Sequence, residues 1–577
     1  MPVRVARVSW RLLLLGFLLF AGAAVLVGRL AYLQIVSHGR YSVEAEDEHL
    51  GVRKLLPPRG AILDRNGFPL ALTLDAYDIS IDREVWQDAE LAREGAEALS
   101  SFLNRSPDDI LAAMGPEKEG DYLLASGLDY AQGAKIVALG LPGVRATPTI
   151  KRFYPEGDLA SGLLGFIGRD KTGLAGLEAD LDPELGGEAG TLYFERDSLG
   201  NPIPFGYQRL IEPQASADVR LTIDRYIQRS VEEQLDATIE ARGAKGGTII
   251  VMEPDTGAIL AMASRPSFKL TELDLSDEAR MEFYRNRAVT DLYEPGSAMK
   301  VVTMAAAVDL GLVGPQTTYE DTGHAYVGGA AIANWDFSAN GTQTMVQLLQ
   351  KSLNTGAVWV SGLIGPERFY EYIERFGFGE PTHVGLSGEA AGVYRTQDDP
   401  EWYPVDLATN SFGQGISVTP LQMITAIAAI VNGGELMRPY VVQEVKGPRE
   451  HRVFEPVVVR RVISEEAAET LREMLREVVE GNPSHLARIS GYHVGGKTGT
   501  SFISVAGGYA PDRTIASFVG FAPAEDPRII VLVKIDEPQN ETLGGMVAAP
   551  VFAELAPRIL SYLGVRPDAP QLVQQGG

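Results

Sequence analysis

One uncharged, apolar run near the amino terminus constrains this chain more than any other feature of its sequence. Residues Leu12–Gly28 carry no charge, and eleven of these seventeen are Leu, Phe or Val. The apolar face continues to Val36, and about 25 helical residues would extend about 37 Å, enough for a tilted bilayer crossing. We therefore predict a transmembrane anchor over residues 12–36. The alternative is a signal peptide cleaved at Ala21–Ala23, but cleavage there would interrupt the apolar run rather than follow it.

Charges beside this run predict its orientation. Arg4, Arg7 and Arg11 precede it, and an excess of positive charge marks the cytoplasmic side of a membrane span. Residues 1–11 would then be a cytoplasmic tail, and the large remainder would lie outside the cytoplasm. No second run of this kind follows, which predicts a single-pass protein.

Composition excludes several classes of function. The net charge is −25, and because residues 1–43 carry five arginines and no acid, the remainder is more acidic still. Such a body is a poor partner for nucleic acid, whose phosphates need clustered Lys and Arg. The chain has no cysteine, which removes disulfides, thiolate metal sites and thiol nucleophiles. No His-Glu-x-x-His spacing or EF-hand loop occurs, so we expect no metal and no other cofactor.

The residues after the anchor begin with a mixed pattern. Strand-like runs such as Tyr77–Ile81 alternate with helical stretches such as Asp88–Phe102, and turn signals are dense. This pattern predicts a strand-rich domain over residues 41–213.

A sharper pattern follows residue 215. Apolar residues every four positions from Ile227 to Ile239 predict a helix, and a hairpin is expected over Thr248–Ala263. After a long helical insert come three strand candidates and a closing helix, at residues 492–500, 514–521, 528–535 and 547–563. This order predicts an α+β domain with a mostly antiparallel sheet over residues 216–565. The Pro- and Gln-rich residues 566–577 are expected to be a disordered tail.

The candidate nucleophiles are Ser, Thr and Lys, because the chain has no cysteine. Ser297-Ala298-Met299-Lys300 is the only Ser-x-x-Lys, and the apolar run Val301–Leu310 places it on the first turn of a buried helix. Residues three apart project from one helix face, and burial lowers the pKa of a lysine, whose neutral amine could take the serine proton. The simpler interpretation is a capping serine followed by a solvated lysine. For His493, we favour a structural role over catalysis.

Two further motifs favour the catalytic interpretation of Ser297 and Lys300 over the simpler one. Ser-x-Asn occurs at Ser338-Ala339-Asn340 and at Ser352-Leu353-Asn354, and we prefer the second because a helical run precedes it. Lys-Thr-Gly occurs at Lys171 and within Lys497-Thr498-Gly499-Thr500, where the second copy lies on a strand candidate. A strand edge with hydroxyls, a lysine and free N–H groups suits a peptide carboxylate. The order Ser297, Ser352, Lys497 is the signature of penicillin-recognising serine enzymes.

On these residues the chain resembles the class B penicillin-binding proteins, which are monofunctional peptidoglycan D,D-transpeptidases. The likeness covers nearly the whole chain and includes Arg59–Gly67, Gly173–Glu178, Tyr293–Gly296 and Phe412–Gly415. Leu353 departs from the Ser-Ser-Asn that is common among relatives, at a position that the family pattern tolerates. The resemblance implies a penicillin-binding transpeptidase domain, preceded by a pedestal domain of the dimerisation type and one transmembrane helix.

The resemblance also implies a reaction. Lys300 would deprotonate Ser297, which attacks a stem peptide ending in D-Ala-D-Ala and expels the terminal D-Ala. Ser352 would relay a proton to the leaving amine, and Asn354 would orient Lys300 and the donor amide. An amine from a neighbouring stem peptide would then resolve the acyl-enzyme into a crosslink.

The remaining implied roles concern charge. The N–H groups of Ser297 and Thr500 would form the oxyanion hole. Lys497, Thr498 and Thr500 would hold the terminal carboxylate. Gly499, which lies between the two threonines, would belong to the same binding strand. β-Lactams should acylate Ser297 and stall there.

Other functions stay open at this point. A β-lactamase or D,D-carboxypeptidase would use water as the acceptor, but the chain lacks the Glu-x-x-Leu-Asn pattern of water-activating lactamases. A non-catalytic β-lactam sensor or scaffold is a third possibility, although the amino-terminal tail is too short for a signalling domain. Within the family, the chain length and the stretch Gly323–Trp335 favour the division or sporulation branch over the elongation branch.

The resemblance also implies a location and partners. The protein would lie in the bacterial cytoplasmic membrane, with its catalytic domain outside. Its ligands would be peptidoglycan stem peptides, with β-lactams as inhibitors. No segment resembles a glycosyltransferase, so a multispanning glycan polymerase and other division proteins are expected partners.

Overall fold

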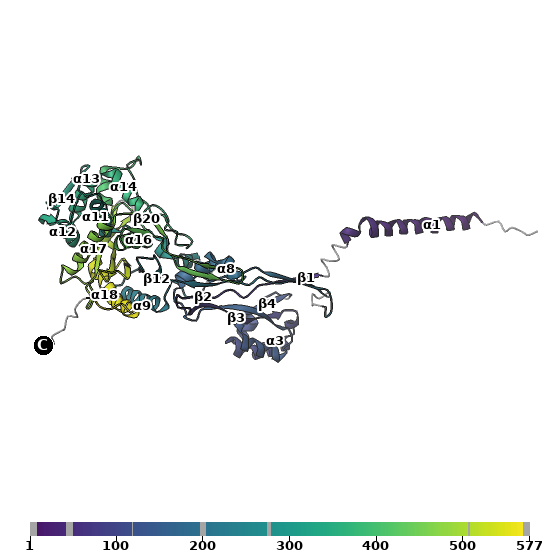
Figure 1. Cartoon of the computed structure of the whole chain (residues 1–577). Helices are drawn as coiled ribbons and strands as arrows, with labels where there is room; N and C mark the ends of the chain where they lie inside the picture. The colour runs from purple at the N-terminus through teal and green to yellow at the C-terminus, as the bar shows by residue number, and fades with distance from the viewer. Residues whose placement is uncertain are drawn as a thin grey trace, which may run out of the picture. The chain divides into compact units, whose positions relative to one another are not determined.

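The computed structural model describes residues 9–41, 50–117, 119–196, 203–273, 278–505 and 508–568 (Figure 1). The described residues fall into two compact units. One lies within Met1–Pro57 and Gly187–Ala215, and the other within Pro58–Gly186 and Ser216–Gly577. The second unit contains every residue predicted to take part in catalysis.

The first unit begins with the predicted anchor, which is helical. α1 spans Trp10–Ala31 and continues as one π-helical turn, Tyr32–Val36. The combined helix has a mean hydropathy of 2.2 and none of it is buried. In the part of the chain that the structure describes, it is the one helix long and apolar enough to cross a membrane. Arg4 and Arg7, on which the predicted orientation partly depends, lie outside the described residues.

A three-stranded antiparallel sheet completes the first unit. Its order is β1-β8-β9, with β1 at Leu50–Leu55, β8 at Gly190–Glu195 and β9 at Gln208–Ile211. The central strand β8 pairs with β1 from Leu50 opposite Glu195 onwards. Segments from the two ends of the predicted first domain therefore form one sheet.

The larger unit contains a seven-stranded sheet built from distant parts of the chain. The strands follow the order β19-β18-β10-β2-β3-β4, and β5 pairs with β3. Only β2 and β10 pair in parallel, among the described strands of this sheet. The bounds are β2 Ile62–Leu63, β3 Pro69–Asp82, β4 Asp121–Asp129, β5 Val144–Phe153, β10 Asp218–Leu221, β18 Val442–Lys446 and β19 His451–Val453. The sheet thus takes strands from both sides of the predicted division at residues 213–216.

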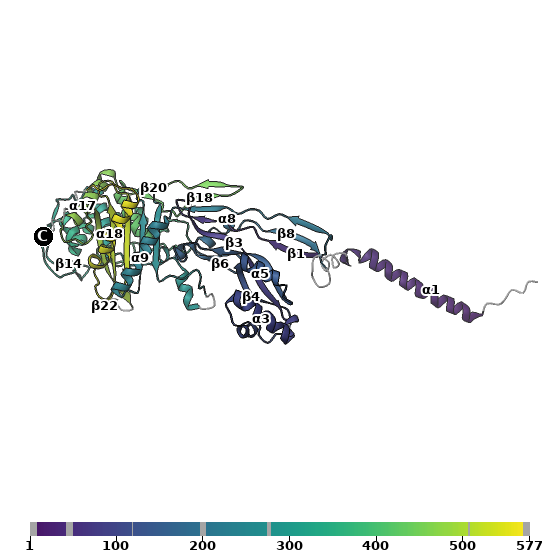
Figure 2. The same ribbon diagram turned by 90° about the horizontal axis from the view of Figure 1, so that it is seen from below.

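Three helices cover one part of this sheet. α3 (Ala89–Leu103), α4 (Pro107–Ala113) and α5 (Tyr130–Leu139) lie beside β3 and β4, and their apolar faces share a core with Ile79 and Ile81 (Figures 1 and 2). The side chain of Asp88 accepts hydrogen bonds from the first N–H groups of α3, which fixes the start of that helix. One short turn, η2 Val85–Gln87, precedes α3. The short elements after β5 are α6 Ser161–Leu164, β6 Phe166–Ile167, β7 Gly173–Ala175, α7 Gly176–Asp180 and α8 Asp182–Gly186.

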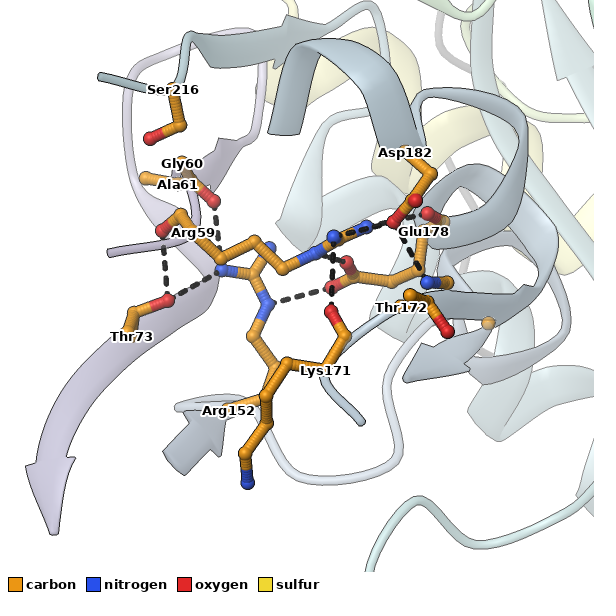
Figure 3. A network of polar contacts seen from close by, with 12 residues as sticks. Arg59, Gly60, Ala61, Thr73, Arg152, Lys171, Thr172, Glu178, Asp182 and Ser216 are labelled. Atoms are coloured by element: carbon orange, nitrogen blue, oxygen red, sulfur yellow. Dashed lines mark hydrogen bonds and ion pairs between the residues drawn. The ribbon is translucent and has the colours of Figure 1, made fainter. Parts of the chain in front are cut away.

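A buried ion-pair network joins these short elements to the sheet. The carboxylate of Glu178, which is fully buried, contacts the Nε atoms of Arg59 and Arg152 at 2.6 Å each (Figure 3). Arg59 also contacts Asp182 Oδ1 at 2.6 Å, and Arg152 donates to the carbonyl of Gly60 at 2.7 Å. Two cations are therefore neutralised and hydrogen-bonded inside the protein, which is the condition under which buried charge is tolerated.

The second half of the larger unit is built on a five-stranded antiparallel sheet. Its order is β12-β11-β23-β22-β21. The bounds are β11 Gly246–Met252, β12 Ile259–Arg265, β21 Gly495–Val505, β22 Gly508–Ala522 and β23 Ile529–Asp536. α9 (Arg225–Arg242) and α18 (Gly544–Tyr562) lie side by side on one face, where they pack against Phe518 and its neighbours (Figure 2).

Helices cover the opposite face of this sheet. Successive residues of a strand point to opposite faces, and Val519 and Leu532 pack here against α11 (Met299–Asp309) and α16 (Pro420–Val431). Every residue of α16 is buried, which explains why its sequence is apolar apart from Gln422 and Thr425. The other helices are η3 Glu278–Tyr284, α10 Arg287–Thr290, η4 Gly296–Ala298, α12 Met345–Lys351, α13 Asn354–Ile364, α14 Pro366–Arg375, α15 Pro404–Asn410 and α17 Glu465–Glu480. Short two-stranded pairs complete it: β13 Thr318–Asp321 with β16 Gly341–Thr344, β14 His324–Val327 with β15 Ala330–Ala333, and β17 Glu435–Met437 with β20 Val458–Arg461.

The predicted fold class is confirmed. Antiparallel strands and flanking helices form the α+β domain that the sequence indicated, and a strand-rich region precedes it. One predicted strand begins later than expected, because β21 starts at Gly495 and not at Tyr492. In the predicted tail, Asp568 accepts a hydrogen bond from the N–H of His493, and residues 569–577 lie outside the described residues.

Removing the central carboxylate of the buried network should destabilise the protein. In the Glu178→Gln variant, Arg59 and Arg152 would keep two buried charges without their shared counter-ion. We expect the free energy of unfolding to fall by about 3–5 kcal/mol, measured by urea titration of the full chain in detergent. Arg93→Ala, which removes an exposed pair with Glu97, is the control and should match the parent protein. Equal urea midpoints for the parent and Glu178→Gln would contradict the importance of this network.

Candidate active site

Ser297 lies where a short 3₁₀ turn leads into a buried helix. The turn η4 precedes α11 directly, so the serine stands just before the helix rather than inside its first α-helical turn. Gly296 has a φ of 55°, and a Cβ there would lie 2.6 Å from the carbonyl oxygen of Thr500. A Cβ on Gly499 would lie 2.7 Å from the carbonyl oxygen of Pro295. Glycine at both positions lets strand β21 approach the serine closely.

Lys300 lies one turn further and points back to the serine. Its side chain is 1% exposed, and its Nζ is 3.0 Å from Ser297 Oγ. The same Nζ lies 2.6 Å from the carbonyl oxygen of Ser352 and 2.8 Å from Asn354 Oδ1. The predicted Ser-x-x-Lys and the second predicted Ser-x-Asn therefore meet at one atom.

These contacts orient the amine of Lys300. A neutral amine has two hydrogens and one lone pair, and both the Ser352 carbonyl and Asn354 Oδ1 can only accept hydrogen bonds. With both hydrogens used, the lone pair faces Ser297, whose hydroxyl donates to it. The Asn354 amide is held in the required orientation, because its Nδ2 donates to the carbonyl of Ala333 at 3.0 Å.

The electrostatic surroundings favour this neutral form. Burial lowers the pKa of Lys300 well below its usual 10.5, and the nearby positive charge of Lys497 lowers it further. Lys300 consequently loses its proton more readily than a solvated lysine. The structure therefore offers a base next to the candidate nucleophile.

Ser352 connects the two lysines. It follows the last turn of α12 and adopts a φ of 56°, an uncommon conformation for a residue with a side chain. Its Oγ lies 3.3 Å from Lys300 Nζ and 3.0 Å from Lys497 Nζ. A single hydroxyl thus bridges both amines, and protons can pass through it.

Lys497 and the residues after it lie on the outer strand of the five-stranded sheet. Lys497 is 2% exposed, and its Nζ also contacts the carbonyl oxygen of Thr498 at 3.1 Å and Thr498 Oγ1 at 3.3 Å. Burial lowers the pKa of Lys497 to about 7. Thr500 Oγ1 accepts from the N–H of Gly544 at 3.0 Å, at the start of α18. No described strand pairs with the outer edge of β21, so that edge is free to bind an extended peptide.

A buried carboxylate that the sequence did not single out supports this site. Asp321, 1% exposed, accepts hydrogen bonds from Asn334 Nδ2, from the N–H of Asn340 and from Thr355 Oγ1, the last at 2.7 Å. Burial alone would raise the pKa of Asp321, but these hydrogen bonds outweigh it and hold that pKa below its usual value. Thr355 directly follows Asn354, so the network fixes the start of α13 beside Lys300. In the sequence, Asp321, Asn334, Asp336 and Asn340 lie within twenty residues of one another, which is a signal that could have indicated this network.

The alternative motif copies lie elsewhere. Asn340 donates to Asp321, and Ser338 donates to Asp336, so the first Ser-x-Asn serves the supporting network. Lys171 lies between β6 and β7, where its carbonyl accepts from Arg59 at 3.4 Å. His493 precedes β21, and its backbone contacts Ala524 and Asp568.

The structure therefore brings the predicted site residues together. Direct contacts link Ser297, Lys300, Ser352, Asn354, Lys497 and Thr498, and the strand carries Gly499 and Thr500 past the serine. Such a site can activate a serine hydroxyl and hold a negatively charged group beside it. That is the chemistry of acyl transfer through a serine ester.

Comparisons with known proteins agree with this geometry. Residues 247–556 match the model of the penicillin binding protein transpeptidase domain, and residues 54–221 match the penicillin-binding protein dimerisation domain. Stage V sporulation protein D of Bacillus subtilis is 36% identical over 99% of this chain and 88% of its own length. Peptidoglycan D,D-transpeptidase FtsI of Escherichia coli is 31% identical over 97% of this chain and 93% of its own length.

Solved structures show the same likeness. Penicillin-binding protein 2X of Streptococcus thermophilus aligns with a TM-score of 0.75 at 26% identity, over 89% of this chain and 81% of its own. Penicillin-binding protein 3 of the tuberculosis bacterium, crystallised with aztreonam, aligns with a TM-score of 0.69 at 28% identity. That alignment covers 91% of this chain and all of the other.

Proposed function

We propose how the serine site works from one premise: this chain belongs to the class B penicillin-binding proteins and is a peptidoglycan D,D-transpeptidase. The observation that carries the proposal is the contact of Ser297 Oγ with Lys300. This lysine is buried, and its other contacts direct the lone pair of its amine at the serine. Its substrate is peptidoglycan, and it binds β-lactams.

In the first half of the proposed reaction, Lys300 takes the proton of Ser297. The serine oxygen forms a bond to the carbonyl carbon of the penultimate D-Ala, and the bond from that carbon to the terminal D-Ala nitrogen breaks. The N–H groups of Ser297 and Thr500 stabilise the negative oxygen of the tetrahedral intermediate. The proton reaches the leaving amine through Ser352, which lies within 3.3 Å of Lys300 Nζ.

In the second half, the amine of a neighbouring stem peptide attacks the ester. Its nitrogen bonds to the carbonyl carbon, the bond to Ser297 breaks, and the proton of the amine returns to the serine oxygen. Before the terminal D-Ala leaves, Lys497, Thr498 and Thr500 hold its carboxylate, while Asn354 orients both Lys300 and the donor amide. Gly499 contributes because it has no side chain, which leaves room for the backbone of Pro295.

The rest of the architecture takes proposed roles from the same family. We propose a pedestal over residues 41–213 and a transpeptidase domain over residues 216–565. The apolar helix is consistent with a single-pass membrane anchor, and we propose that the amino terminus is cytoplasmic because Arg11 precedes the apolar run. The Gly39→Cys variant, in a chain with no other cysteine, should react with an impermeant maleimide added outside intact cells. Labelling only after the cells are lysed would contradict this orientation.

Acylation should require Ser297. Full-length protein in detergent is expected to form a stable adduct with fluorescent penicillin. Ser297→Ala should abolish it, because among the described residues the bridging Ser352 is the one other hydroxyl that contacts Lys300. Gel fluorescence and mass spectrometry of the labelled peptide give the readout. Ser230→Ala, on the exposed face of α9, is the control and should label normally. An adduct that survives in Ser297→Ala would refute the assignment, and rapid penicillin turnover would favour a hydrolase.

The second-order acylation rate should depend on pH in a bell shape. The rate rises as Lys300 loses its proton, at a pH well below that of a solvated lysine because burial and the charge of Lys497 lower its pKa. Above about pH 7, Lys497 loses the charge that holds the donor carboxylate, so the rate should fall. Stopped-flow acylation between pH 5 and 10 measures this, with circular dichroism to show that the fold persists. A rate that is flat across that range would contradict the two roles.

We propose further that the crosslinking is septal and that a multispanning glycan polymerase with other division proteins forms its complex. The likeness to the transpeptidase FtsI and to a sporulation protein supports this assignment. Depletion in the source bacterium should give filaments that lack septa, as seen by microscopy with a peptidoglycan dye. Rounded or bulging cells that still divide would instead support the alternative, an elongation-type role.

A further inference from the structure

The loop between β15 and β16, residues 334–340, borders the active site at two places. The side chain of Asn354 donates to the last carbonyl of β15 at 3.0 Å, just before the loop begins. Inside the loop, the indole Nε1 of Trp335 donates to the carbonyl oxygen of Lys351 at 3.3 Å. Lys351 directly precedes Ser352. The loop therefore lies beside two residues of the catalytic machinery.

Both ends of this loop are fixed by the buried carboxylate of Asp321. Asn334 Nδ2 donates to that carboxylate at 2.9 Å, and the N–H of Asn340 donates to it at 3.0 Å. Between these two anchors, the hydrogen bond of Trp335 to α12 holds the indole ring in one orientation. A ligand that binds this loop consequently loses little affinity to the ordering of protein groups.

Two adjacent residues of the loop, Trp335 and Asp336, are open to solvent. Trp335 is 60% exposed although its ring is held in place. The carboxylate of Asp336 accepts from the hydroxyl of Ser338 at 2.7 Å and from its N–H at 3.0 Å, and these bonds hold the pKa of Asp336 below its usual value. Among the described residues, no lysine or arginine forms an ion pair with this carboxylate. An aromatic face and an unpaired carboxylate in adjacent residues are groups that bind an ammonium ion.

The second half of the reaction brings a positive group to a cleft that already holds one. The amine of the neighbouring stem peptide is protonated at neutral pH, as primary alkyl amines are. When the terminal D-Ala leaves with its carboxylate, the charge of Lys497 has lost its counter-ion and repels the incoming ammonium group. A site that binds this group beside the cleft offsets the repulsion and raises the local concentration of the acceptor.

We propose that Trp335 and Asp336 bind the ammonium group of the acceptor before it attacks the acyl-enzyme. The ammonium group contacts the indole face and the carboxylate. It then gives one proton to water, and the nitrogen of the resulting amine bonds to the carbonyl carbon of the ester. A second proton passes from that nitrogen to the oxygen of Ser297 as the ester bond breaks. The proposal rests on the proposed function, because it concerns the acyl-enzyme on Ser297.

Competition between a charged and an uncharged amine tests the proposal. A donor peptide ending in D-Ala-D-Ala acylates Ser297 of the full chain in detergent, and two acceptors are supplied together at neutral pH. One is the amide of Nα-acetyl-lysine, whose amine is protonated, and the other is methoxyamine, which is uncharged. Mass spectrometry of the two products gives the ratio in which they form. Because both acceptors compete for the same acyl-enzyme, a change in the acylation rate does not alter this ratio.

Substitutions assign the preference to the two residues. Asp336→Asn and Trp335→Leu should each lower the ratio of charged to uncharged product by about threefold, because each removes one exposed contact to the ammonium group. Trp335→Phe keeps an aromatic face, so its ratio should lie between those of the parent and Trp335→Leu. Glu469→Gln, which removes an exposed charge on α17, is the matched control and should keep the ratio of the parent. Circular dichroism shows that each variant is folded.

Penicillin labelling of the parent protein separates this proposal from the proposed function. If penicillin acylates Ser297 and both amines form products, but the ratio of either Asp336→Asn or Trp335→Leu equals that of the Glu469→Gln control, the ammonium site is overturned and the proposed function stands. If water alone resolves the acyl-enzyme, or if neither penicillin nor the donor acylates Ser297 in folded protein, both proposals are overturned.

Discussion

The burial of two lysines in one cleft is the constraint on which the site depends. Each amine is nearly inaccessible to water, burial lowers the pKa of both, and the charge of Lys497 lowers that of Lys300 further. Loss of the proton from Lys300 relieves both the cost of its burial and the repulsion by Lys497. Lys300 contacts Ser297, and Ser352 bridges the two lysines, so the base and the carboxylate-binding group share one buried cleft.

The two buried lysines keep these positions only if the surrounding backbone does not move. The outer strand β21 and the turn η4 are in contact without intervening side chains, because glycine occupies both surfaces. Asp321 fixes the remaining side of the site, because its carboxylate accepts hydrogen bonds from Asn334, from Asn340 and from Thr355 at the start of α13. Helices on both faces of the five-stranded sheet then hold the strand itself. The reactive groups are thus positioned by packing and by hydrogen bonds of buried neighbours, as preorganised catalysis requires.

Local patterns predicted much of this arrangement. The helical spacing of Ser297 and Lys300, and the helical run before Ser352, indicated the correct partners because both depend on residues close in sequence. Asp321 was missed, since its contacts join segments that no periodicity relates. The pairing of β2 with β10 was missed for the same reason: β2 has only two residues, too few for a pattern. Tertiary contacts at long range are what single-sequence reasoning lacks.

The seven-stranded sheet has a consequence for how the protein is made. Ile62 pairs with Val219, whose strand also pairs with β18 near Val445, so this sheet cannot close until most of the chain has emerged. At about 5–20 residues per second, that interval is on the order of tens of seconds. During this time an unpaired strand edge is open to wrong partners. Correct folding consequently depends on keeping the early strands of this sheet from pairing wrongly until the last strands have been made.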